Sequence, residues 1–155
     1  MGIKSIRKGK VGEREFINLL KDYLGDDAIK RNLDQTRDGG HDVIGIDGWT
    51  IEIKRAAKPN LTAWWNQAVE QAIGNGEPVL AYRIDRRPWR VILSIGSIHP
   101  EIPSFGYDLD YCVEMSVLAF CSIVRERMEE INDDDTSNIR YDAGAQERFW
   151  NQGRP

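Results

Sequence analysis

The chain has 155 residues, the length of a single domain, and its hydrophobic content of 41% is enough to build a core. No apolar run reaches the roughly 20 residues that cross a bilayer, and residues 1–10 lack the apolar stretch of a signal peptide, so we expect a cytoplasmic protein without membrane contact. The net charge of −4 is unevenly divided, because residues 1–97 carry 16 Lys+Arg against 13 Asp+Glu and residues 98–155 carry 5 against 12. A basic part suits contact with phosphates, although solvated charge without a partner explains it equally well.

The first predicted element is an amphipathic helix over residues 9–24. Its apolar side chains lie within about 80° of Glu13 on a helical wheel, and they are Phe16, Ile17, Leu20, Tyr23 and Leu24. Glu13 therefore lies on the apolar stripe, whereas Glu15 is predicted to point to solvent. A carboxylate on a core-facing stripe is costly unless a cation, a metal or a hydrogen-bond donor compensates it; an edge position that reaches water is the alternative.

Three short strands are predicted after this helix, over residues 28–33, 41–46 and 49–55. Residues 34–40 form a loop, and Asp47-Gly48 forms a turn.

The second half of the chain is predicted as a helix over 61–73, strands over 78–84 and 89–95, an irregular segment over 97–110 and a helix over 116–131. This order predicts an α/β fold with a central mixed β-sheet flanked by helices. The acidic segment 132–155 is expected to be a loosely held tail. Cys112 and Cys121 are expected to be structural thiols rather than a disulfide.

The strand over residues 49–55 carries an acid and a base on one face. Because side chains alternate along a strand, Glu52 and Lys54 share one face while Trp49, Ile51 and Ile53 share the other. Many exposed strands contain Glu-x-Lys, so the pair becomes informative only together with another acid.

Asp42, one strand earlier, is the candidate for that acid. A two-residue loop at Asp47-Gly48 would put Asp42 and Glu52 on opposite faces of a hairpin. A three-residue loop over 46–48, with Gly48 in the left-handed conformation, would place them opposite each other. A shared site thus requires the longer loop or a bulge.

Two neighbouring carboxylates repel each other unless a cation lies between them. Carboxylate oxygens suit Mg²⁺ or Mn²⁺. Such an ion assists phosphodiester hydrolysis by stabilising charge on the phosphate and by lowering the pKa of an attacking water. Lys54 beside it would orient that water or neutralise developing charge, and Glu13 would add a further acid.

These residues also carry a family resemblance. Asp42 followed by Glu52-Ile53-Lys54 resembles the PD-(D/E)xK nuclease signature, and residues 7–15 are similar to the start of archaeal-type Holliday junction resolvases. Segments 78–81 and 89–92 resemble the later strands of that family, so the resemblance covers about residues 7–95. It implies a restriction-endonuclease-like core over residues 1–131 and a homodimeric, metal-dependent endonuclease that cuts four-way DNA junctions.

The resemblance also implies roles for particular residues. Glu13, Asp42 and Glu52 would be metal ligands with the Ile53 carbonyl, and Lys54 would be the catalytic lysine. Gln67 sits where related nucleases often carry a helical glutamine, although Gln71 competes for that place. The sequence departs from the family in having His41 before the aspartate, where proline is usual, and in its acidic carboxyl-terminal segment.

Several cations and aromatic residues would contact DNA under this interpretation. The cations nearest the site are Arg7, Lys8, Lys10, Arg55 and Lys58, and each would otherwise be solvated surface. Arginines also surround the predicted turn at residues 85–88, namely Arg83, Arg86, Arg87 and Arg90. Trp64 and Trp65 would stack on unpaired bases or, as the more common alternative, pack in a core or a dimer interface.

Two other functions fit the same residues. One is a less selective nuclease for flaps, nicks or linear duplex DNA. The other is a DNA-binding module on a nuclease fold that has lost catalysis, although all four active-site positions carry the expected residue types. A cell or a virus could encode a small protein of either kind.

Overall fold

The computed structural model describes residues 3–33, 40–102 and 107–137. The chain divides into two compact units, Met1–Ile123 and Val124–Pro155, and the sheet and cleft discussed below lie in the first. None of the described helices is long and apolar enough to span a membrane. The elements in chain order are α1 (Ile3–Leu24), β1 (Lys30–Arg31), β2 (Val43–Ile44), β3 (Trp49–Ala56), α3 (Leu61–Ala72), β4 (Glu77–Ile84), β5 (Arg90–Ser94), α4 (Ile95–Ile98), the 3₁₀ helix η1 (Leu109–Tyr111), β6 (Cys112–Ser116) and α5 (Val117–Ser137).

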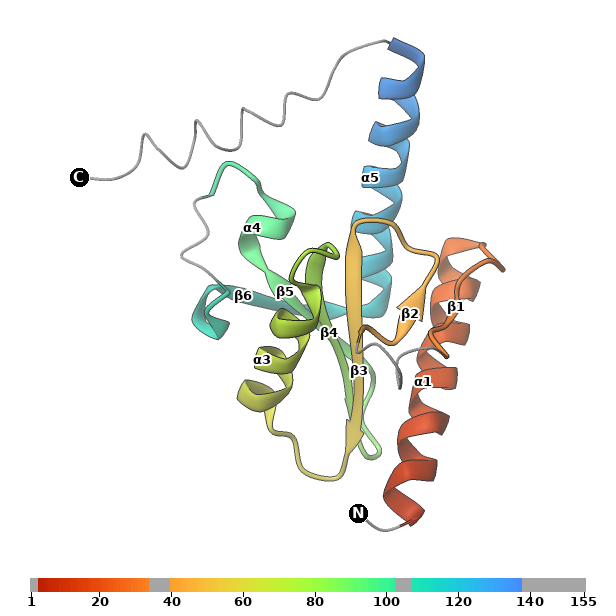
Figure 1. Ribbon diagram of the computed structural model, residues 1–155, viewed down its shortest axis with the longest axis vertical. Helices are drawn as coiled ribbons and strands as arrows, with labels where there is room; N and C mark the ends of the chain where they lie inside the picture. Colours follow the sequence, from red (N-terminus) through yellow and green to blue (C-terminus); the bar gives the residue numbers. More distant parts are fainter. Residues whose placement is uncertain (1–2, 34–39, 103–106, 138–155) are drawn as a thin grey trace, which may run out of the picture. The chain divides into compact units, whose positions relative to one another are not determined.

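A four-stranded mixed sheet in the order β3-β4-β5-β6 organises the first unit. The β3–β4 pair is parallel, with α3 as its crossover, and the two later pairs are antiparallel. Both α1 and α3 contact β3, and they lie on opposite sides of it (Figure 1). The predicted α/β fold with helices flanking a mixed sheet is confirmed.

Helix α1 packs through the predicted apolar stripe, since Phe16, Ile17 and Leu20 are buried. It begins at Ile3, six residues before the predicted start. Residues 3–8 contain neither proline nor glycine, so they can continue the helix toward the amino terminus. The prediction that Glu15 points to solvent was wrong: its carboxylate forms ion pairs with Arg55 and Arg83.

The predicted hairpin between residues 41–46 and 49–55 was also wrong. Strand β2 is only two residues long and pairs antiparallel with β1 in a separate two-stranded sheet. The link to β3 is a tight turn in which the Trp49 amide donates to the Ile46 carbonyl at 3.4 Å. Gly48 has φ +80° in this turn, a conformation that glycine adopts without strain. After Asp42 the chain therefore pairs with β1 through β2, and it enters β3 only at Trp49.

Strand β6 has no counterpart among the predicted elements, which placed an irregular segment over 97–110 and then a helix from 116. Its five residues lack a regular apolar alternation and are mostly half-exposed, and pairing with β5 keeps them extended. The following helix begins at Val117, one residue after the predicted start, and is described as far as Ser137. Residues 138–155 of the predicted tail lie outside the described residues. Cys112 and Cys121 form no disulfide with each other; Cys121 is buried, and Cys112 is half-buried.

Candidate active site

A cleft of about 410 Å³ opens beside β3, with residues from α1 on one wall and residues from α3 on the other. Its lining residues are Gly9, Glu13, Asp42, Glu52, Ile53, Lys54, Arg55, Ala56, Trp64 and Gln67. The cleft thus brings together every residue that the sequence predicted as catalytic or metal-binding.

Asp42 reaches this cleft from the residue before β2. Its backbone amide donates to the Ile51 carbonyl at 2.9 Å, and its carboxylate Oδ2 accepts from the Ile53 amide at 2.6 Å. These two hydrogen bonds flank Glu52, so Asp42 lies opposite Glu52 at the edge of the sheet. Asp42 and Glu52 therefore lie near each other, as predicted. Their proximity comes from the two hydrogen bonds of Asp42 to β3 and not from a continuous hairpin.

Glu52 is the most deeply placed acid of the cleft, with 2% of its surface exposed. Its Oε1 lies 2.5 Å from Lys54 Nζ and accepts a hydrogen bond from Gln67 Nε2 at 2.8 Å. Its Oε2 is buried without a hydrogen-bond partner. Burial raises the pKa of Glu52 and the Glu13 charge adds to this rise, while Lys54 and a hydrogen bond from Gln71 lower the pKa. Both glutamines weighed from the sequence therefore face Glu52.

Glu13 occupies the α1 wall of the cleft and is mostly buried. Its carboxylate accepts a hydrogen bond from Arg31 Nε on β1. Sequence reasoning missed Arg31, because a single cation in a two-residue strand forms no motif with an acid 18 positions earlier. The cation expected to compensate Glu13 on its apolar stripe is thus an arginine.

The donor set of the cleft suits a divalent metal ion in one respect and not in another. Glu52 Oε2 is a buried carboxylate oxygen that meets no donor, which is an atom that a cation would stabilise. Among residues 3–33, 40–102 and 107–137, however, no three His, Cys, Asp or Glu side chains are close enough together to hold a metal ion. Lys54 and Arg31 neutralise two of the acids instead.

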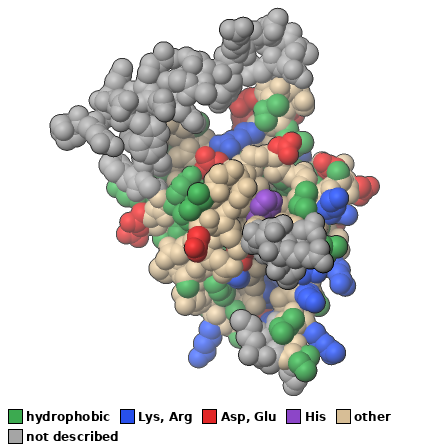
Figure 2. Space-filling view, in the orientation of Figure 1, with side chains coloured by type: hydrophobic (Ala, Val, Ile, Leu, Met, Phe, Trp, Pro, Cys, Tyr) green, Lys and Arg blue, Asp and Glu red, His purple; other side chains and the backbone are tan. Residues whose placement is uncertain are grey.

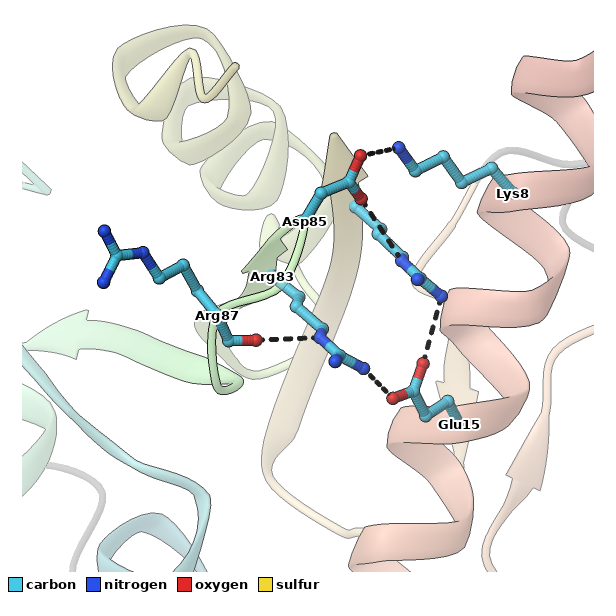
Figure 3. A network of polar contacts seen from close by, with 6 residues as sticks. Lys8, Glu15, Arg83, Asp85 and Arg87 are labelled. Atoms are coloured by element: carbon cyan, nitrogen blue, oxygen red, sulfur yellow. Dashed lines mark hydrogen bonds and ion pairs between the residues drawn. The ribbon is translucent and has the colours of Figure 1, made fainter. Parts of the chain in front are cut away.

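A second group of charges adjoins the cleft through Arg55, and we call it the α1–β3 ion-pair network. It joins Lys8 and Glu15 of α1 to Arg55 of β3 and to Arg83 and Asp85 around the end of β4 (Figure 3). Arg83 Nε also donates to the Arg87 carbonyl at 2.8 Å. The hydrogen bond from Lys8 is the largest cause of a lowered Asp85 pKa.

The predicted DNA-binding cations divide between this network and the surface. Lys8 and Arg55 are engaged in the network, whereas Arg7, Lys10 and Lys58 are exposed. Figure 2, in the same orientation as Figure 1, shows Lys and Arg side chains on the part of the molecule that α1 occupies. A basic surface therefore borders the cleft.

The chain was compared with protein families, with curated proteins and with solved structures. No protein-family model and no curated protein matches the chain. Among solved structures, the chain is similar to Hjc, a Holliday junction resolvase from the archaeal hyperthermophile Archaeoglobus fulgidus, at 15% sequence identity and a TM-score of 0.47. The match covers 72% of this chain and 97% of that chain.

Proposed function

We propose that the protein is a metal-dependent DNA endonuclease that cuts four-way junctions. The observation that carries the proposal is convergence: Glu13, Asp42 and Glu52 line one cleft with Lys54 and Gln67, although they come from separate elements. Three acids and a lysine beside a basic surface are the groups that phosphodiester hydrolysis needs.

Glu13, Asp42 and Glu52 would hold Mg²⁺ or Mn²⁺ with the Ile53 carbonyl once they draw closer together than they stand in this structure. The bound ion would stabilise negative charge on the phosphate and make a water molecule more acidic. Because the pKa of Glu52 is raised by burial, a cation at Oε2 would also favour the ionised form of this carboxyl.

The other residues of the cleft act on the same phosphate. Lys54, which contacts Glu52, would orient the attacking water or neutralise charge on the phosphate. Gln67 would hold Glu52 in place through its hydrogen bond to Oε1. Arg7, Lys10 and Lys58 would bind phosphates farther along the DNA. A homodimer would present two such clefts for paired cuts across a junction.

A DNA-binding module without catalysis is the second candidate. It is favoured by the absence, among the described residues, of a cluster of three metal-binding side chains. It would use the same basic surface and leave the DNA intact.

The deciding experiment compares cleavage of a labelled four-way junction and a linear duplex of the same sequence. Each is incubated with Mg²⁺, with Mn²⁺, with EDTA, and with the Glu52→Ala variant. Paired symmetric cuts in the junction alone, lost with EDTA and with the variant, are the expected result. Equal cutting of both DNAs would leave a less selective nuclease, and binding without cutting in either metal would establish the DNA-binding module.

A further inference from the structure

Two consecutive tryptophans of α3 have different surroundings. Trp65 is 1% exposed, belongs to the hydrophobic cluster between α3 and the sheet, and donates through Nε1 to the Tyr107 carbonyl at 2.7 Å. Trp64 packs against the edge of that cluster but is only partly buried, and it lines the cleft. Core packing therefore accounts for Trp65 and leaves the cleft-facing part of Trp64 unexplained.

The Trp64 ring is held in place by its neighbours. Its centroid lies 6.2 Å from that of Tyr82, with the two rings tilted by 47°. The Tyr82 hydroxyl donates to Glu114 of β6, and Glu114 Oε2 lies 3.6 Å from Arg90 Nε of β5. An aromatic ring fixed in this way loses little further freedom when a ligand stacks on it.

Trp64 also lies close to the groups proposed for catalysis. Gln67, one helical turn later on the same face of α3, donates to Glu52 at 2.8 Å. Tyr82, the neighbour of Trp64, is the cross-strand partner of Lys54. A phosphate held at Lys54, beside Glu52, would therefore bring the sugar and base of the same or the next nucleotide to the Trp64 ring.

The cleft has room for that base. Its volume of about 410 Å³ lies in the range of sites that enclose small organic ligands, roughly 300–1,000 Å³, and is more than an ion and a phosphate group occupy. Gly9, on the α1 wall, has no atom within 4 Å of the position where a Cβ would be. The side of the cleft that α1 contributes is thus open at this residue.

We propose that Trp64 is a stacking platform for a nucleobase that has separated from its pair beside the scissile phosphate. The inference rests on the proposed nuclease function and narrows its substrate class to DNA with a splayed nucleotide at a branch. Stacking on an indole tolerates any base, because every base presents a π face. The platform would therefore select DNA structure and not sequence.

The test is a binding measurement in EDTA, which is independent of cleavage. The probe is a forked duplex with one unpaired 2-aminopurine at the branch, and the control is the same DNA fully paired. We expect wild-type protein to quench the probe by stacking, Trp64→Phe to retain much of the quenching, and Trp64→Leu to abolish it. Trp64→Leu should weaken binding of the fork by about 5-fold to 100-fold and leave the paired duplex unchanged.

A second pair of variants tests the same space from the opposite wall, without touching the packing of α3. Gly9→Leu should fill the opening and weaken binding of the fork selectively, whereas Gly9→Ala should bind as wild type does. The proposal is overturned if Trp64→Leu retains the quenching, or if it weakens fork and duplex equally while lowering the melting temperature, since Trp64 would then be a packing residue. If wild-type protein gives these binding results but does not cleave DNA in Mg²⁺, the nuclease function is rejected and Trp64 remains a stacking platform.

Discussion

The two charged groups beside β3 differ in the sign of their excess charge. In the cleft, Glu13 and Glu52 form ion pairs with Arg31 and Lys54, and the third acid, Asp42, accepts a hydrogen bond from the Ile53 amide. In the α1–β3 ion-pair network, the two acids Glu15 and Asp85 face three cations.

The pKa values follow this difference. Burial dominates at Glu52 and raises its pKa, whereas the hydrogen bond from Lys8 dominates at Asp85 and lowers its pKa. A carboxyl whose pKa is raised by burial is typical of a site that binds a cation, whereas a carboxyl whose pKa is lowered by a cation is typical of a structural ion pair. The comparison therefore predicts which acids serve activity and which serve the fold.

The largest expected effect separates Glu52 from Glu15. Glu52→Gln should lower cleavage of a junction by about 10³-fold, because an amide is a poor ligand for a divalent ion. Its free energy of unfolding without metal should change little or rise, since the substitution removes a buried charge. Glu15→Gln should retain most activity and lose about 1 kcal/mol of stability.

Single-turnover cleavage and urea denaturation of both variants measure this contrast. A Glu15→Gln protein that loses activity without losing stability would show that the network serves the reaction as well.

The next effect concerns Lys54, which lies on the cleft face of β3. Lys54→Met should lower the cleavage rate by about 10²-fold while DNA binding in Ca²⁺ is retained, because the lysine acts on the reacting phosphate or water. The matched control is Arg83→Met, in the network and not among the cleft-lining residues, which should reduce stability by disturbing Glu15. Equal rates for wild type and Lys54→Met would remove Lys54 from the mechanism.

A smaller effect is the pH dependence of the network. Because the pKa of Asp85 is lowered in the folded state, its contribution to stability is present above the ordinary value of 3.8 and is lost as the pH falls through the lowered folded value. Asp85→Asn should therefore flatten the acid side of the curve of unfolding free energy against pH. Thermal melts between pH 2 and 6 measure it, and identical acid limbs for the two proteins would contradict the assignment.

The sequence predicted which residues line the cleft better than it predicted the strand pairing that places them there. Glu52 and Lys54 followed from alternation along one strand, which is a local property. Glu13 followed from its place on the apolar stripe of α1. The position of Asp42 did not follow, since β2 pairs with β1 while Asp42, the residue before β2, bonds to Ile51 and Ile53 of β3.

The α1–β3 ion-pair network and the pairing of Arg31 with Glu13 were also not predictable, because they too depend on contacts between distant elements. Arg31, Glu15 and Asp85 meet partners 18, 40 and 77 positions away, and such pairs depend on the packing of α1 against the sheet. Strand β6 is defined by its pairing with β5 and not by an alternating pattern of its own. Local periodicity identifies elements, whereas the contacts between elements need the assembled fold.

The smallest expected effect uses two glycines of α1, one beside each charged group. Gly9 lies at the cleft with open space around it, so Gly9→Ala should raise the free energy of unfolding by about 0.5–1 kcal/mol through helix propensity alone. At Gly12 a Cβ would lie 3.2 Å from Arg55 Cβ, so Gly12→Ala should forfeit that gain and destabilise the protein by pushing α1 away from β3. Urea denaturation of the two variants measures the difference. An equal gain for both would mean that α1 is as loosely packed over the network as it is at the cleft, and the distinction between a tight structural face and an open binding face would then fail.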